Sequence, residues 1–109
     1  MLSEFADDED MQPLIEEFLS ELAPKTRQLR ALAAAGDLHE LGRLAHQLKG
    51  SGGGYGYPAI TRTAADLEAA VRDNGNRQDI PGTLERLVET CERAIVANRG
   101  NSGSVEMSR

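Results

Sequence analysis

Residues 36–58 read "GDLHELGRLAHQLKGSGGGYGYP" and carry the strongest structural signals in the chain. Gly36 suits the position just after a helix end, and Asp37, with Glu40 three residues later, suits the start of the next helix. Apolar residues then recur at helical spacing on one side of that helix: Leu38, Leu41, Leu44, Ala45 and Leu48. The stretch therefore predicts a helix that begins after Asp37, runs through the glycines and ends before Pro58.

The rest of the chain predicts three further helices. Apolar spacing predicts a first helix over residues 8–35, in which Pro24 removes a backbone hydrogen bond and should cause a bend. Pro58 suits the first turn of a third helix, and the turn cluster Asp73–Asn76 separates it from a fourth that starts near Asp79–Pro81. Four amphipathic helices with short connections predict an all-α fold, an antiparallel up-down four-helix bundle.

The chain is expected to form one domain followed by a tail. Its 109 residues suit a single domain. Aromatic residues make up only 4% of it while alanine and leucine are abundant, which favours packed helices over a sheet. We expect the bundle to occupy residues 1–98, and the polar, aperiodic residues 99–109 to form a flexible tail.

Composition and charge argue against several classes of protein. Twelve basic residues against 18 acidic ones give a net charge of −6, whereas nucleic-acid binding needs a basic face. The single cysteine, Cys91, excludes an internal disulfide and offers no metal cluster. The acidic N-terminus does not resemble a signal peptide, and no apolar run approaches the roughly 20 residues of a membrane span. We therefore expect a soluble, cytoplasmic protein with no nucleic-acid or membrane partner, and its surface pattern favours a monomer.

His46 lies on the polar side of the second predicted helix, roughly 135° from the centre of the leucine stripe, and should point to solvent. Its neighbours one or two turns away include Gly42, Gly50 and Gly53. A glycine inside a helix lowers stability by on the order of 0.5–1 kcal/mol relative to alanine, so three of them beside one histidine need another explanation. Removing side chains there lets another molecule approach the imidazole closely.

Two cations flank the same histidine. Lys49 follows His46 by three residues and Arg43 precedes it by three, so both lie beside it on the helix surface. A neutral imidazole nitrogen is a nucleophile near neutral pH, and positive charge nearby favours an anion. The combination suits a histidine that carries a phosphoryl group, with Lys49 neutralising phosphate charge and Arg43 as a candidate second cation or docking residue.

The segment "AHQLKGSGGGYG", residues 45–56, closely resembles the motif of histidine-containing phosphotransfer (HPt) domains of two-component signalling. The family pattern has a histidine, a lysine and a glycine three and four residues later, a small residue, and a further glycine. In this chain the pattern is filled by His46, Lys49, Gly50, Ser51 and Gly53. The stretch "AAAGDLHELGRLAHQLKG" also resembles the family's approach to its phosphorylated helix, and the resemblance extends over residues 8–98.

The resemblance implies that His46 accepts a phosphoryl group from an aspartyl phosphate on one response-regulator receiver domain and passes it to another. The partners would be receiver domains, a hybrid sensor histidine kinase, or both. The receiver would supply the catalytic aspartate and Mg²⁺, so this chain would bind no cofactor or metal of its own. The chain would then be a phosphoryl carrier without kinase activity, which agrees with the lack of a nucleotide-binding loop in its sequence.

Each residue near His46 has its own expected role. Gly50 and Gly53 keep the approach open, and Gln47 and Ser51 are candidate hydrogen-bonding helpers. The apolar flank of the second helix, with the exposed side of the first, would dock the receiver. His39, two turns earlier, and the third-helix residues Arg62, Asp66 and Glu68 are interpreted as solvated surface residues.

Two other functions are considered for the same site. The chain could be an adaptor of the same fold that binds receivers or a sensor kinase without being phosphorylated. It could also be an enzyme that uses His46 as a general base, but the sequence offers no partner carboxylate or oxyanion donors for that role. Phosphoryl transfer from a phosphorylated receiver distinguishes the carrier from the adaptor.

Overall fold

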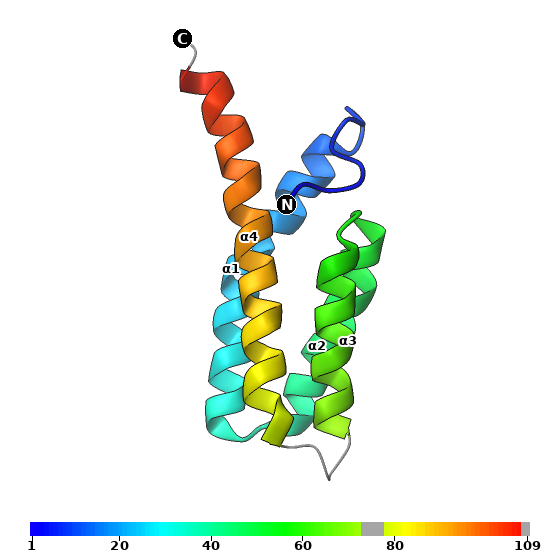
Figure 1. The fold of residues 1–109 in the computed structure, drawn as a ribbon, viewed down its shortest axis with the longest axis vertical. Coiled ribbons are helices and arrows are strands. Elements are labelled where there is room, and N and C mark those ends of the chain that lie inside the picture. Colours follow the sequence, from blue (N-terminus) through cyan, green and yellow to red (C-terminus); the bar gives the residue numbers. More distant parts are fainter. Residues whose placement is uncertain (73–77, 108–109) are drawn as a thin grey trace.

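The computed structural model describes residues 1–72 and 78–107, with side chains as far as residue 98. The described part of the chain contains four α-helices and no strand. They are α1 (Gln12–Ala35), α2 (Leu38–Gly54), α3 (Pro58–Arg72) and α4 (Ile80–Met107), shown in Figure 1. The prediction of an all-α fold with four helices is confirmed.

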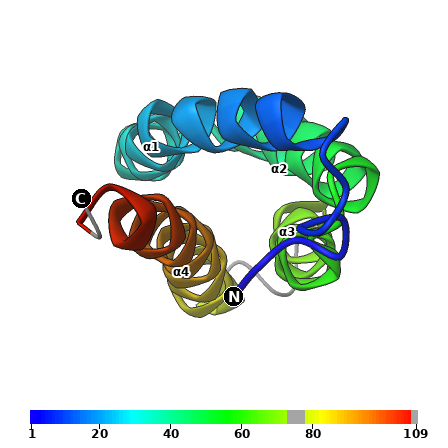
Figure 2. The same cartoon turned by 90° about the horizontal axis from the view of Figure 1, so that it is seen from above.

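The four helices surround one core. Followed by colour in Figure 1, the chain descends α1, ascends α2, descends α3 and ascends α4. Seen from above in Figure 2, the helices lie around a ring in which α1 packs on α2 and α4, and α3 packs on α2 and α4. The α2–α3 contact is the most extensive of these. The site described below lies on this pair of helices.

The leucine stripe of α2 faces the core, as its spacing predicts. Leu41, Leu44, Ala45 and Leu48 are buried there, and Leu38 is half-buried at the start of the helix. Burial of such side chains is the main favourable term in folding. Because this side of α2 is committed to the core, the opposite side of the helix is left facing solvent.

The connection between α1 and α2 contains the helix-ending glycine and the helix-capping aspartate that the sequence predicts. Gly36 has φ +73°, in the left-handed region that glycine enters without strain, and its N–H donates to the carbonyl of Ala33. The Asp37 side chain accepts a hydrogen bond from the Glu40 N–H at 3.3 Å. These two residues end one helix and cap the next, so α2 starts at a defined residue and its side chains have a defined phase.

α1 differs from its prediction at its start. The helix begins at Gln12 rather than near residue 8, because residues 4–11 form turns instead. Pro24 lies inside one continuous helix, and the bend expected there stays a prediction.

The N-terminal turns close over the α2–α3 connection. The Ser3 hydroxyl donates to the carbonyl of Tyr55 at 2.6 Å, and the Glu4 N–H donates to the carbonyl of Gly56 at 2.7 Å. Gly56 has φ +83°, and a Cβ there would clash with Ser3 and Phe5. Glycine is therefore required at this turn, which holds the end of α2 that follows the histidine.

The C-terminal part of the chain is helical where the sequence predicts a tail. The backbone of α4 continues to Met107, although residues 99–109 lack the periodicity of a packed helix. The flexibility of that segment and the domain boundary at residue 98 stay predictions. The expected turn Asp73–Asn76 lies outside the described residues. No helix in the described part of the chain is long and apolar enough to cross a membrane.

Candidate functional site

His46 projects from the middle of α2 on the side away from the leucine stripe. Its side chain is 61% exposed, so the prediction that it faces solvent is confirmed. An imidazole on a rigid helix surface is both accessible to a partner and limited in its range of orientations.

The Nδ1 atom of His46 lies 2.8 Å from Oε2 of Glu68, a residue of α3. An ionised carboxylate only accepts hydrogen bonds, so Nδ1 must carry the proton and donate it. The lone pair of the neutral ring is then on Nε2, and no described residue forms a hydrogen bond with that atom. The contact with Glu68 thereby leaves Nε2 as the ring nitrogen whose lone pair faces away from Glu68.

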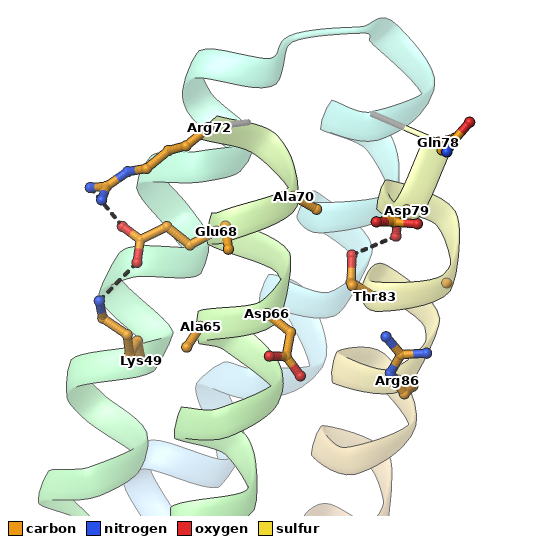
Figure 3. Close-up of a pocket in the computed structure, with 12 residues that line it drawn as sticks. Lys49, Ala65, Asp66, Glu68, Ala70, Arg72, Gln78, Asp79, Thr83 and Arg86 are labelled. Atoms are coloured by element: carbon orange, nitrogen blue, oxygen red, sulfur yellow. Dashed lines mark hydrogen bonds and ion pairs between the residues drawn. The ribbon is translucent and has the colours of Figure 1, made fainter. Parts of the chain in front are cut away.

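Glu68 also binds two cationic side chains, Lys49 and Arg72. The Nζ atom of Lys49 donates to Oε1 of Glu68 at 2.8 Å, and an Nη2 of Arg72 donates to Oε2 at 3.0 Å. Figure 3 shows Lys49 from α2 and Arg72 from α3 reaching this carboxylate from opposite sides. Glu68 is 4% exposed, and buried acidic side chains are rare unless they are paired in this way.

The charge state of Glu68 follows from these contacts. The hydrogen bond from Lys49 lowers the pKa of Glu68 most, the burial of the carboxylate opposes it, and His46 and Arg72 lower the pKa further. The pKa lies below its ordinary value of 4.5, so the carboxylate is ionised at neutral pH. Glu68 therefore acts at neutral pH as an anion shared by three donors.

Acid should weaken folding through Glu68. Because the folded-state pKa of Glu68 is lowered from 4.5, its contribution to stability is present above that pH and is lost as the pH falls through the folded-state value. We expect the free energy of unfolding to fall less between about pH 7 and about pH 3 in Glu68→Gln than in the native chain. Urea unfolding at several pH values measures this difference. Equal declines in the two proteins would contradict the assigned role.

The interpretation of Glu68 as a solvated surface residue is wrong, whereas Arg62 and Asp66 are exposed as expected. Glu68 directly follows the buried Leu67 and lies one turn after the buried Ala64, so it borders the apolar stripe of α3. That position was the available signal. It did not reveal His46 and Lys49 as partners, because they lie on the neighbouring helix α2.

The glycines near His46 divide into open and packed positions. Gly50 is exposed, and a Cβ placed there would have no atom of the described residues within 4 Å, which confirms the open surface predicted at this position. At Gly53, also exposed, a Cβ would meet Thr61 at an ordinary 3.4 Å. At Gly42 a Cβ would lie 3.2 Å from Cγ1 of Val71. Gly42 is half-buried against α3 and also lines the surface pocket beside His46, so its expected part in opening the approach stays a prediction.

Arg43 has a partner of its own. Its guanidinium donates to the carboxylate of Glu40 at 3.0 Å, and the pair raises the pKa of Arg43 and lowers that of Glu40. Arg43 still lines, with His46 and Arg72, a surface pocket of about 450 Å³. The structure thus brings a cation that the sequence analysis had not considered, Arg72, to the pocket beside His46.

The remaining expected residues lie near the site without a contact to the imidazole. Gln47 is exposed and Ser51 is half-buried on α2, and their roles as hydrogen-bonding helpers stay predictions. His39 is exposed and lines the same pocket as His46. Within residues 1–72 and 78–98, no group of three His, Cys, Asp or Glu side chains is placed to hold a metal ion.

The chain is thus a small four-helix domain with an exposed histidine on α2 that is held by a buried carboxylate of α3. A family model described as the Hpt domain matches residues 13–97, which is most of the chain. The chain belongs to the Hpt domain family, and membership connects it with histidine phosphotransfer in phosphorelays. Searches among curated proteins and among solved structures found no match.

Proposed function

We propose that this chain is a histidine phosphotransfer protein. His46 accepts a phosphoryl group from the aspartyl phosphate of a response-regulator receiver and passes it to another receiver. The observation that carries the proposal is the exposed imidazole whose Nδ1 is bound by Glu68 at 2.8 Å, which leaves Nε2 available. The site lies on what we take to be an antiparallel up-down bundle, and the domain acts in the cytoplasm as a monomer.

The chemistry at Nε2 needs no proton to leave the ring. The Nε2 lone pair attacks the phosphorus, a P–N bond forms, and the P–O bond to the receiver aspartate breaks, releasing its carboxylate. The ring becomes positively charged while its proton stays on Nδ1, and the adjacent Glu68 carboxylate stabilises that charge. In the return step the ring leaves as a neutral imidazole, which is a better leaving group than an imidazolate.

The cations around Glu68 suit an arriving phosphoryl group. Lys49 and Arg72 each contact Glu68 through one nitrogen in a salt bridge, and both retain further N–H donors for an anion. A phosphoryl group on a side chain carries about −1.5 to −2 charge at neutral pH, so nearby cations stabilise it. Lys49 is the main residue that neutralises phosphate charge in this proposal, and Arg72, instead of Arg43, is the second cation.

The other components come from the partner. The receiver domain supplies the aspartate and the Mg²⁺ that polarises the phosphoryl oxygens, and this chain supplies the imidazole and its surroundings. The chain is then a carrier without kinase activity of its own. A hybrid sensor kinase or separate receivers would serve equally as the donor.

Transfer from a receiver tests the proposal against the adaptor alternative. The chain is incubated with a phosphorylated receiver and Mg²⁺, and we expect an acid-labile, alkali-stable phosphoryl group to appear on it. The modified nitrogen is then assigned by phosphorus and imidazole NMR, with Nε2 expected. Binding to the receiver without any transfer would support the adaptor and overturn the carrier.

Replacement of Glu68 by alanine should slow transfer without removing it. A hydrogen bond to a charged group contributes about 1.5–3 kcal/mol, and each 1.36 kcal/mol is tenfold in rate, so we expect a loss of about 10- to 100-fold. Glu68→Gln keeps an acceptor oxygen but loses the charge and should fall between alanine and the native chain. Single-turnover transfer rates measure the series. Native rates in both variants would remove Glu68 from the mechanism.

A further inference from the structure

Two glycines of α2 pack against α3: Gly52 is buried and Gly42 is half-buried. A Cβ at Gly42 would lie 3.2 Å from Cγ1 of Val71, and a Cβ at Gly52 would lie 3.0 Å from both the backbone nitrogen and the Oγ1 of Thr61. These distances are shorter than ordinary carbon contacts. At each position an added Cβ would require its neighbour on α3 to shift by a few tenths of an ångström, so glycine permits the observed spacing without that shift.

The two close contacts lie on either side of the bond between His46 and Glu68. Along α2, Gly42 precedes His46 and Gly52 follows it. The order is reversed along α3, where Val71, which contacts Gly42, follows Glu68, and Thr61, which contacts Gly52, precedes it. The two helices, which lie side by side in Figures 1 and 2, are thus in close contact both before and after the site.

A hydrogen bond fixes the same interface near Lys49. The Thr61 hydroxyl donates to the carbonyl of Lys49 at 2.8 Å, and the Nζ of Lys49 donates to Glu68 at 2.8 Å. One residue of α2 is therefore bound to α3 through both its backbone and its side chain. A hydrogen bond weakens steeply with distance, so a small separation of the helices would lengthen the contacts of Glu68 with Lys49 and His46 together.

We propose that Gly42 and Gly52 are positioning residues that set the α2–α3 spacing at which Glu68 reaches Nδ1 of His46 and Nζ of Lys49. Their effect on rate rests on the proposed phosphotransfer function. Their effect on geometry does not, because the protonated nitrogen of the imidazole can be read by NMR in the unphosphorylated chain.

Gly52→Ala should have the larger effect, because the added methyl meets the backbone of Thr61, which cannot rotate away. We expect the imidazole ¹⁵N shifts of His46 to change from a single Nδ1–H form towards a mixture of tautomers. Single-turnover transfer should slow, but by less than the roughly 100-fold that a misplacement of 1 Å can cost, because the neighbours of Gly52 need to shift by only a few tenths of an ångström. Urea unfolding shows whether the bundle remains folded.

Gly42→Ala offers a steric rescue. Its added methyl meets a side chain, and Val71→Ala removes that side chain, so the double variant should recover the native imidazole signals and transfer rate that Gly42→Ala alone reduces. Gly54→Ala is the matched control, because a Cβ there has no described atom within 4 Å, and it should keep the native imidazole signals.

The outcomes separate the two proposals. Native imidazole signals in folded Gly52→Ala, or no recovery on adding Val71→Ala to Gly42→Ala, would overturn the positioning role. If Gly52→Ala does not fold, the Gly42 and Val71 variants decide alone. Shifted imidazole signals with no transfer even in the native chain would support the positioning role and overturn the carrier function.

Discussion

His46→Gln is expected to accept no phosphoryl group from a phosphorylated receiver, while it still folds and still binds that receiver. Glutamine has a similar reach but no nitrogen lone pair that can attack phosphorus, so the acceptor atom is lost. The His46 side chain is 61% exposed, and Lys49 and Arg72 still pair with Glu68 when His46 is replaced, so the free energy of unfolding should change little. Radiolabelled transfer and a binding assay on the same preparation measure both properties.

His39→Gln is the matched control for that variant. His39 is the second of the two histidines in the chain, lies on the same face of α2 and is exposed. Its replacement should leave the transfer rate unchanged. Acid-labile phosphate on His46→Gln, or its loss in His39→Gln with retention in His46→Gln, would show that the phosphoryl group is carried elsewhere.

Gly50→Leu should block transfer while leaving the bundle intact or more stable. The position is exposed with no described atom within 4 Å of a Cβ, so the side chain has room in the free protein. It lies one turn after His46, where a partner must approach, and displacing the reacting atoms by even 1 Å can cost about 100-fold. We therefore expect a loss of at least about 100-fold in transfer rate, measured under single-turnover conditions.

The free energy of unfolding of Gly50→Leu should rise, although its transfer rate falls. Glycine in a helix interior is about 1 kcal/mol less favourable than alanine, and leucine is close to alanine, so urea unfolding should show a gain of up to about 1 kcal/mol. Gly50→Ala should show a similar gain and retain most of the transfer. Native transfer in Gly50→Leu would contradict the view that glycine keeps this surface open.

The two variants rest on features that the local sequence predicts well. A leucine stripe at helical spacing defines which side of α2 is buried, and the helix geometry then places His46 and Gly50 on the other side. Both predictions are confirmed, because they depend on residues of one helix whose start is set by Asp37. The resemblance to HPt domains predicted a phosphoryl-carrying role for His46, and the family match over residues 13–97 agrees with the resemblance.

Helical spacing predicts exposure less well for residues at the contact between two helices. Gly42 lies on the histidine side of α2 yet is half-buried against Val71, and Glu68, at the border of the apolar stripe of α3, is buried against His46 and Lys49. A helical wheel gives the angle of a residue about its own axis and says nothing about how closely a neighbouring helix approaches. Residues at the border of an apolar stripe are therefore the ones that it assigns incorrectly.

The sequence alone determined that the chain is helical, where α2 begins and ends, and that the imidazole of His46 stands on an exposed helix face among glycines and a lysine. These properties follow from spacing and capping within single segments, where each residue acts on neighbours a few positions away. Only the tertiary structure decided that a buried carboxylate on α3 binds that imidazole through Nδ1 together with Lys49 of α2. That arrangement depends on the packing of α3 against α2, which places Glu68 near residues about 20 positions earlier in the chain.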